Sequence, residues 1–173
     1  KTKIEAYQQA ACFYHQAYNK QNKAYSLVNW LEVENILVLL DSRKWGQAVK
    51  TEDYSYRVPV INEVIGLLDS MVDSIVSSPV DELSYWDWAS AANIKLCLLM
   101  LGHKAPGYKA PAYEVILEEY KNTWDKAGSI GKKLGEIEHL DFLIDALRQG
   151  KKPNATVVKT KIDNLRDELE KMI

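Results

Sequence analysis

One pair of residues has the types and spacing of metal ligands. Glu136 and His139 form the pattern Glu-x-x-His in the run EIEH, and a separation of three residues places both side chains on one face of a helix. Di-iron carboxylate proteins use two such motifs and two further glutamates. Neither His15 nor His103 has a glutamate three residues before it. We therefore expect no metal site, and interpret Glu136 and His139 as surface polar residues beside an apolar helical stripe.

A second pair, Cys12 and His15, could supply a nucleophile and its base. Both would lie on one helix, whereas a catalytic dyad usually takes its base from another element, with a third group to orient it. We therefore expect Cys12 to be an ordinary buried thiol. Cys97 also lies in an apolar helical pattern, which favours two free cysteines in a reducing cytosol over a disulfide. The glycines at 128, 131 and 135 follow no strand and precede no Gly-Lys-Ser/Thr, so they form no phosphate loop.

Charge and hydropathy exclude several classes of partner. The net charge is −2 and the pI is about 6.0, so no overall basic field would hold nucleic acid or an anionic membrane. The aromatic residues Tyr85, Trp86 and Trp88 could stack on bases, but acidic residues surround them. The longest apolar run, Leu96–Leu101, is far shorter than the roughly 20 residues of a membrane-spanning helix. We expect a cytoplasmic protein without a cofactor or enzymatic activity.

The pair Asn29–Trp30 stands in the most apolar part of the chain, YSLVNWLEVENILVLL. On a helix, Ser26, Asn29 and Glu32 form a narrow polar strip, and apolar residues cover most of the remaining circumference. Such a helix has neighbours on at least two sides. We therefore expect Asn29 to bond to a neighbouring helix or loop, and Trp30 to pack in the core with its indole N–H satisfied.

Seven segments carry the 3.6-residue period of amphipathic helices, and none alternates like a strand. Pro59 and Pro111 are expected to open helices, Gly102 and Gly128 to end them, and Ser129 to cap the next one. The segments fall into hairpins at about 1–41, 58–101 and 111–149, followed by a last helix at about 155–173. We predict an all-α domain of stacked antiparallel hairpins, an α-solenoid of tetratricopeptide type with a C-terminal capping helix. A closed helical bundle is the alternative.

Three runs carry a resemblance to a known family: FYHQAYNKQNKAYSLVNWLEVENIL, SYWDWASAANIKLCLLM and EEYKNTWDKAGSIGKKLGEIEHLDFLIDAL. The first resembles the junction between helices of bacterial tetratricopeptide-like arrays. The other two resemble the closing part of arrays that accompany CHAT (caspase-like) protease domains, and a related region occurs beside kinase domains. The resemblance covers about residues 5–149. It implies a sensing or scaffolding region whose chemistry belongs to another domain, so no catalytic residue is transferred to this chain.

The expected function follows from these exclusions. We expect a non-catalytic interaction or regulatory segment of a larger multidomain protein, because the chain begins at Lys1 rather than Met and already in helical register. Its partner would be a protein or an adjacent domain. A stand-alone bundle that binds metal or performs catalysis through Glu136 and His139 is the alternative. Solenoids bind partners on the face formed by the first helices of successive hairpins. The candidate binding residues on that face are Gln9, Gln16, Glu63, Glu118, Lys121 and Asn122.

Overall fold

The computed structural model describes residues 2–102 and 107–173, and His103 lies outside them. Over the described residues the chain forms seven α-helices and one small antiparallel sheet, so the predicted all-α class is confirmed. The helices are α1 (Lys3–Gln21), α2 (Ala24–Leu39), α3 (Ile61–Ser77), α4 (Tyr85–Leu101), α5 (Tyr113–Ala127), α6 (Ile130–Leu147) and α7 (Pro153–Glu170). The strands are β1 (Ala48–Lys50) and β2 (Ser55–Arg57), and a single 3₁₀ turn covers Val80–Glu82.

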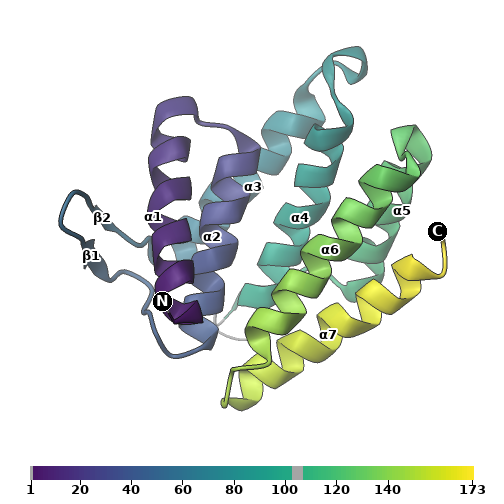
Figure 1. The fold of residues 1–173 in the computed structure, drawn as a ribbon. Helices are drawn as coiled ribbons and strands as arrows, with labels where there is room; N and C mark the ends of the chain where they lie inside the picture. The colour runs from purple at the N-terminus through teal and green to yellow at the C-terminus, as the bar shows by residue number, and fades with distance from the viewer. Residues whose placement is uncertain (1, 103–106) are drawn as a thin grey trace.

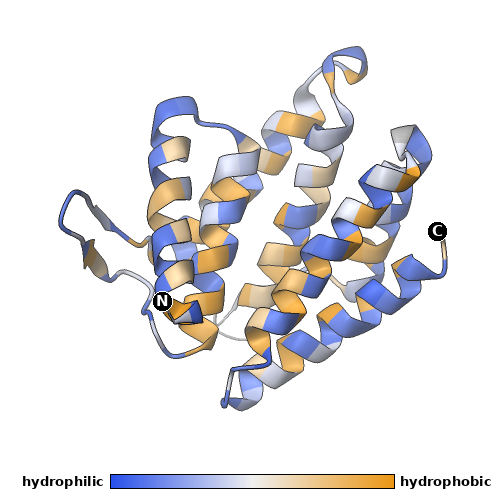
Figure 2. Ribbon diagram, viewed as in Figure 1, coloured by the Kyte–Doolittle hydropathy of each residue, from blue (hydrophilic) through white to orange (hydrophobic). Residues whose placement is uncertain are grey.

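The helices α2 and α4 form the centre of the molecule. Thirteen of the sixteen residues of α2 are buried, against α1, α3, α4 and α6. Helix α4 packs against α2, α3 and α5. Apolar residues therefore predominate along both helices (Figure 2), whereas α7 shows many polar residues as it crosses α6 and contacts α5 (Figure 1). Because α2 and α4 are apolar nearly all round, they must be enclosed by other helices.

Local sequence explains where several helices begin and end. The hydroxyl of Thr2 accepts the N–H of Glu5, whose carboxylate accepts the N–H of Thr2, and this capping box opens α1. The predicted cap is confirmed at Ser129, whose hydroxyl accepts the N–H of Lys132 at the start of α6. The predicted ends at Gly102 and Gly128 are also confirmed, since these residues follow α4 and α5 directly.

Both helices with a predicted proline start begin two residues after the proline. The third helix begins near Pro59 as predicted, but its first residue is Ile61, because the carboxylate of Glu63 accepts the N–H of Val60 and fixes the first turn there. Helix α5 begins at Tyr113, two residues after Pro111, with Ala112 in the extended conformation of a cap residue.

The expectation that no strand occurs is wrong. The segment between α2 and α3 contains a short hairpin in which Ala48 pairs with Arg57 and Lys50 with Ser55. Val49 and Tyr56 alternate with exposed neighbours and are buried. A strand of three residues contains a single alternation, too little for the pattern to be recognised in the sequence. The hairpin projects beside α1, far from the C-terminus (Figure 1).

Candidate functional site

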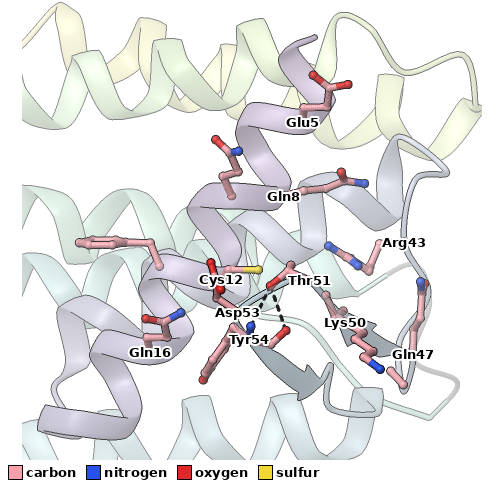
Figure 3. A pocket seen from close by; sticks show the side chains of 14 residues that line it. Glu5, Gln8, Cys12, Gln16, Arg43, Gln47, Lys50, Thr51, Asp53 and Tyr54 are labelled. Carbon is pink, nitrogen blue, oxygen red and sulfur yellow. Dashed lines mark hydrogen bonds between the residues drawn. The ribbon is translucent and has the colours of Figure 1, made fainter. Parts of the chain in front are cut away.

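A groove of about 690 Å³ separates α1 from the β1–β2 hairpin. Figure 3 shows side chains from α1 along one side of it, and side chains from the loop before β1 and from β1 on the other. We call it the α1–β1 groove. Its lining consists of Glu5, Gln8, Gln9, Cys12, Phe13, Gln16, Arg43, Gln47, Ala48, Val49, Lys50, Thr51, Asp53 and Tyr54. Amide side chains are frequent here, and Phe13 is 66% exposed.

Within the described part of the chain, strand β1 has no strand on its other side and presents an unpaired main-chain edge to the groove. The N–H of Thr51 donates to the carbonyl of Tyr54, and the N–H of Val58 donates to the carbonyl of Gln47. In an antiparallel pair these bonds alternate along the strand. Val49 consequently bonds to β2, while the N–H and C=O groups of Ala48 and Lys50 point away from it. Residues of β1 line the groove and residues of β2 do not, so this open edge borders the groove.

A buried ion pair adjoins the groove through Arg43, which lines it. The Nε of Arg43 lies 3.2 Å from the Oε2 of Glu34, and their side chains are 6% and 0% exposed. The hydroxyl of Tyr56 donates to the Oε1 of Glu34. Burial raises the pKa of Glu34, while Tyr56 and Arg43 oppose that rise. The ion pair therefore connects α2 to the loop that leads into β1 and to β2, and holds one wall of the groove in place.

Cys12 and His15 do not form an activated pair. The Nδ1 of His15 lies 2.6 Å from the hydroxyl of Tyr54, and its ring stacks on Tyr56. Burial lowers the pKa of His15 and raises the pKa of Cys12. At neutral pH the side chains are therefore a neutral imidazole and a protonated thiol, and a protonated thiol is a poor nucleophile. Both Cys12 and Cys97 are free.

The predicted binding residues lie at separate places. Gln9 and Gln16 line the α1–β1 groove, whereas Glu63 is occupied in capping α3. On α5, the side chains of Glu118 and Asn122 are exposed and Lys121 is partly buried. The pKa of Glu168 on α7 is lowered chiefly by its hydrogen bond to Lys171 and also by Lys121, which therefore lies near that carboxylate. The groove residues of the loop before β1 and of β1 itself were not predicted, because a strand was not expected there.

The interpretation of Glu136 and His139 as surface residues is wrong. Glu136 is 4% exposed. The Nε2 of His139 lies 3.1 Å from the Oε2 of Glu32, which is buried on α2. The Oε2 of Glu136 accepts a bond of 3.4 Å from the Nδ2 of Asn93 on α4. The hydroxyl of Tyr120 on α5 donates to the Oδ1 of Asn93. Four helices thus contribute to one buried polar network, facing a small cleft between α2, α4 and α6.

Burial and pairing shift two pKa values in this network. Burial raises the pKa of Glu136 to about 7. The pKa of His139 rises to about 9, because attraction to Glu32 and Glu136 outweighs the desolvation that lowers it. His139 is therefore an imidazolium paired with the Glu32 carboxylate at neutral pH, and a protonated imidazole is no metal ligand. Within residues 2–102 and 107–173, no three His, Cys, Asp or Glu side chains are grouped to hold a metal ion.

Asn29 and Trp30 both belong to the architecture, with two corrections. The Nδ2 of Asn29 donates to the carbonyl of Tyr25 at 2.7 Å, within its own helix rather than across to a neighbour. Trp30 is buried as predicted, at 3% exposure. Among the described residues its indole N–H has no hydrogen-bond partner of standard geometry. It approaches Glu34 one turn later, where it opposes part of the rise in pKa that burial causes.

Comparison with known proteins adds no family assignment. The chain matches no family model, no curated protein and no solved structure at a significant level. Over the described residues, no helix combines the length and the hydropathy needed to span a membrane.

Proposed function

We propose that the chain is a non-catalytic protein-interaction segment and that the α1–β1 groove is its binding site. One observation carries the proposal: the groove is bordered by the open main-chain edge of β1. Unpaired strand edges pair with extended segments of other chains. In keeping with the resemblance to arrays beside protease or kinase domains, the segment would regulate or position a partner domain of a larger protein.

The groove favours an extended polypeptide as the ligand. Main-chain groups of Ala48 and Lys50 supply hydrogen bonds that do not depend on the sequence of the partner. The amides of Gln8 and Gln16 across the groove offer both donors and acceptors to the outer edge of such a strand. Phe13, exposed on the same wall, provides apolar contact area for one side chain of the partner. The cysteine in the groove is a protonated thiol, so it does not act as a nucleophile there, in keeping with a site that only binds.

For the arrangement of the helices, we propose a bundle built around α2 and α4, the alternative raised by the sequence. The contacts of α2 with α1, α3, α4 and α6 support it, as do those of α4 with α2, α3 and α5. In a solenoid each hairpin contacts only the hairpins next to it in sequence. Here α6, from the predicted third hairpin, packs on α2 of the first as well as on α7, and α5 packs on α4 and α7. A bundle places the binding surface at its side, where the hairpin stands against α1.

A displayed library of random peptides tests the proposal. Selected peptides are measured against the wild type and two groove variants. Phe13→Ala removes the apolar contact, and burying a phenylalanine contributes about 1.5–3 kcal/mol, so the affinity falls roughly 10- to 100-fold. Ala48→Pro removes an outward N–H from an edge strand and leaves the bonds to β2 intact; a single hydrogen bond contributes about 0.5–1.5 kcal/mol, or roughly 2- to 10-fold.

The matched control is Phe142→Ala. Phe142 is an exposed aromatic of α6, 42% exposed and outside the groove, and its loss leaves the affinity unchanged. If the selection yields only peptides whose affinity is the same for all three variants, the groove is not the binding site.

A further inference from the structure

We propose that the cleft between α2, α4 and α6 is a second binding site, one that takes the head group of an organic cation, an alkylammonium or a guanidinium. The cleft has a buried carboxylate at its base, from Glu136, and exposed aromatic residues at its mouth, Tyr25 and Trp86. This combination recognises alkylated ammonium and guanidinium groups, because the carboxylate supplies charge and the rings attract cations through their faces.

One oxygen of Glu136 is available to a ligand. Its Oε2 accepts the bond from Asn93. Its Oε1 has no hydrogen bond to the described residues and is not fully buried, and Glu136 lines the cleft. This oxygen is therefore open to the cleft. The carboxylate is 4% exposed, and its polar neighbours are the weak neutral donor Asn93 and the His139 imidazolium, which is itself paired with Glu32. Part of its desolvation cost therefore remains, and a bound cation would offset it.

The aromatic residues at the mouth are accessible. Tyr25 is 63% exposed and Trp86 is 58% exposed. The neighbouring rings on α4 already attract cations of this chain: Lys132 stands 4.6 Å from the centroid of Tyr85, and Lys126 stands 3.1 Å from that of Trp88. Trp86 meets Tyr85 edge to face, and no lysine or arginine of the described residues is placed over its ring. Among these three aromatic rings of α4, that of Trp86 is therefore the one available to an external cation.

The size of the cleft limits the ligand. Its volume is about 160 Å³, well below the roughly 300–1,000 Å³ of pockets that enclose drug-sized molecules. It accommodates a head group with its first carbons, and the remainder of the ligand stays outside. A free amine and the end of a lysine or arginine side chain of another protein share this chemistry.

Charged neighbours set the pH range of binding. His139 lines the same cleft and is cationic, but its charge is balanced by the paired carboxylate of Glu32 on α2. Tyr85 of α4 and Tyr120 of α5 have raised pKa values and are neutral. The charge open to a ligand is therefore that of Glu136, which ionises near pH 7. The affinity for cations rises with pH through about 7 and is roughly tenfold lower for each pH unit below it.

Calorimetric titration of the intact chain tests the site with choline, n-butylammonium and the neutral isostere of choline, 3,3-dimethyl-1-butanol. Both cations bind at pH 8, and the alcohol binds at least tenfold more weakly. Glu136→Gln keeps the shape and removes the charge, so the affinity for cations falls about 10- to 100-fold. Trp86→Leu lowers it about two- to fivefold. The control Glu138→Gln, exposed on the same helix, leaves it unchanged.

A capped lysine or arginine dipeptide distinguishes the two sources of the cation. If the dipeptide binds more tightly than n-butylammonium, the site takes a side chain of a protein partner. If it binds equally or more weakly, the site takes free amines. In both cases Glu136→Gln must weaken binding. The proposal is overturned if neither cation binds at pH 8, if choline and the alcohol bind equally, or if Glu136→Gln, shown to be folded by circular dichroism, binds like the wild type.

Discussion

The variant Arg43→Met is expected to destabilise the protein strongly, although Arg43 belongs to a loop and not to a helix. Arg43 and Glu34 are almost fully enclosed, at 6% and 0% side-chain exposure. Removal of one partner leaves a buried carboxylate without its counter-charge, which costs about 3–5 kcal/mol. Methionine retains most of the apolar stem of arginine, so little of this cost comes from lost packing. Chemical denaturation at pH 8 measures the change in the free energy of unfolding.

The pH dependence of the loss identifies its cause. Burial already raises the pKa of Glu34, and without Arg43 it rises further. The folded variant then takes up a proton as the pH falls, which relieves the unpaired charge. The loss is therefore smaller at pH 5 than at pH 8. The second variant, Glu34→Gln with Arg43→Met, has no buried charge to leave unpaired and recovers most of the stability.

A loss below about 1 kcal/mol for Arg43→Met at pH 8 would refute this reasoning, because it would mean that water reaches the Glu34 carboxylate. An equal loss at pH 5 and pH 8 would also refute it, since the cost would then come from packing alone.

Other changes test separate parts of the account. Glu136 has a folded pKa of about 7 against 4.5 when exposed, so its protonation contributes stability that is complete below pH 4.5 and is lost as the pH rises through 7. Raising the pH from 4.5 to 8 is therefore expected to lower the unfolding free energy of the wild type by up to about 3 kcal/mol relative to that of Glu136→Gln, as denaturation at both pH values measures. The same pH dependence in both proteins would contradict the raised pKa. Trp30→Ala costs about 3–5 kcal/mol, as for other core aromatics, and near-wild-type melting would show that its site collapses without cost. Charge reversal of Glu118 and Lys121 together leaves peptide affinity unchanged if the groove is the site, and a tenfold loss would return the binding surface to α5.

Helices were predictable because each element carries its own signals. The capping residue Ser129 and the stops at Gly102 and Gly128 depend on neighbours in sequence, and the apolar circumference of α2 predicted its burial. The short hairpin was not predictable. Its strands of three residues are held by the burial of Val49 and by contacts of Tyr56 with His15 of α1 and Glu34 of α2, which are tertiary contacts rather than a local pattern.

The polar networks were missed for a related reason. The helical spacing of Glu136 and His139 indicated a shared face, but the partners that bury this face, Glu32 and Asn93, are distant in sequence. One signal was present: Glu32 and Glu34 stand in an otherwise apolar helix, and carboxylates in such a position are buried only when paired. That signal indicates that partners exist, and the fold alone supplies their identity.

Residue-resolved amide hydrogen exchange, with and without a library-selected peptide, tests most directly whether the open edge of β1 is the binding site. The bound peptide is expected to slow exchange at Ala48 and Lys50 by at least roughly tenfold, because their N–H groups gain hydrogen-bond partners. Val49, already bonded to β2, changes little and serves as the internal control. Saturating peptide that leaves Ala48 and Lys50 unchanged, while slowing exchange elsewhere, would contradict the account.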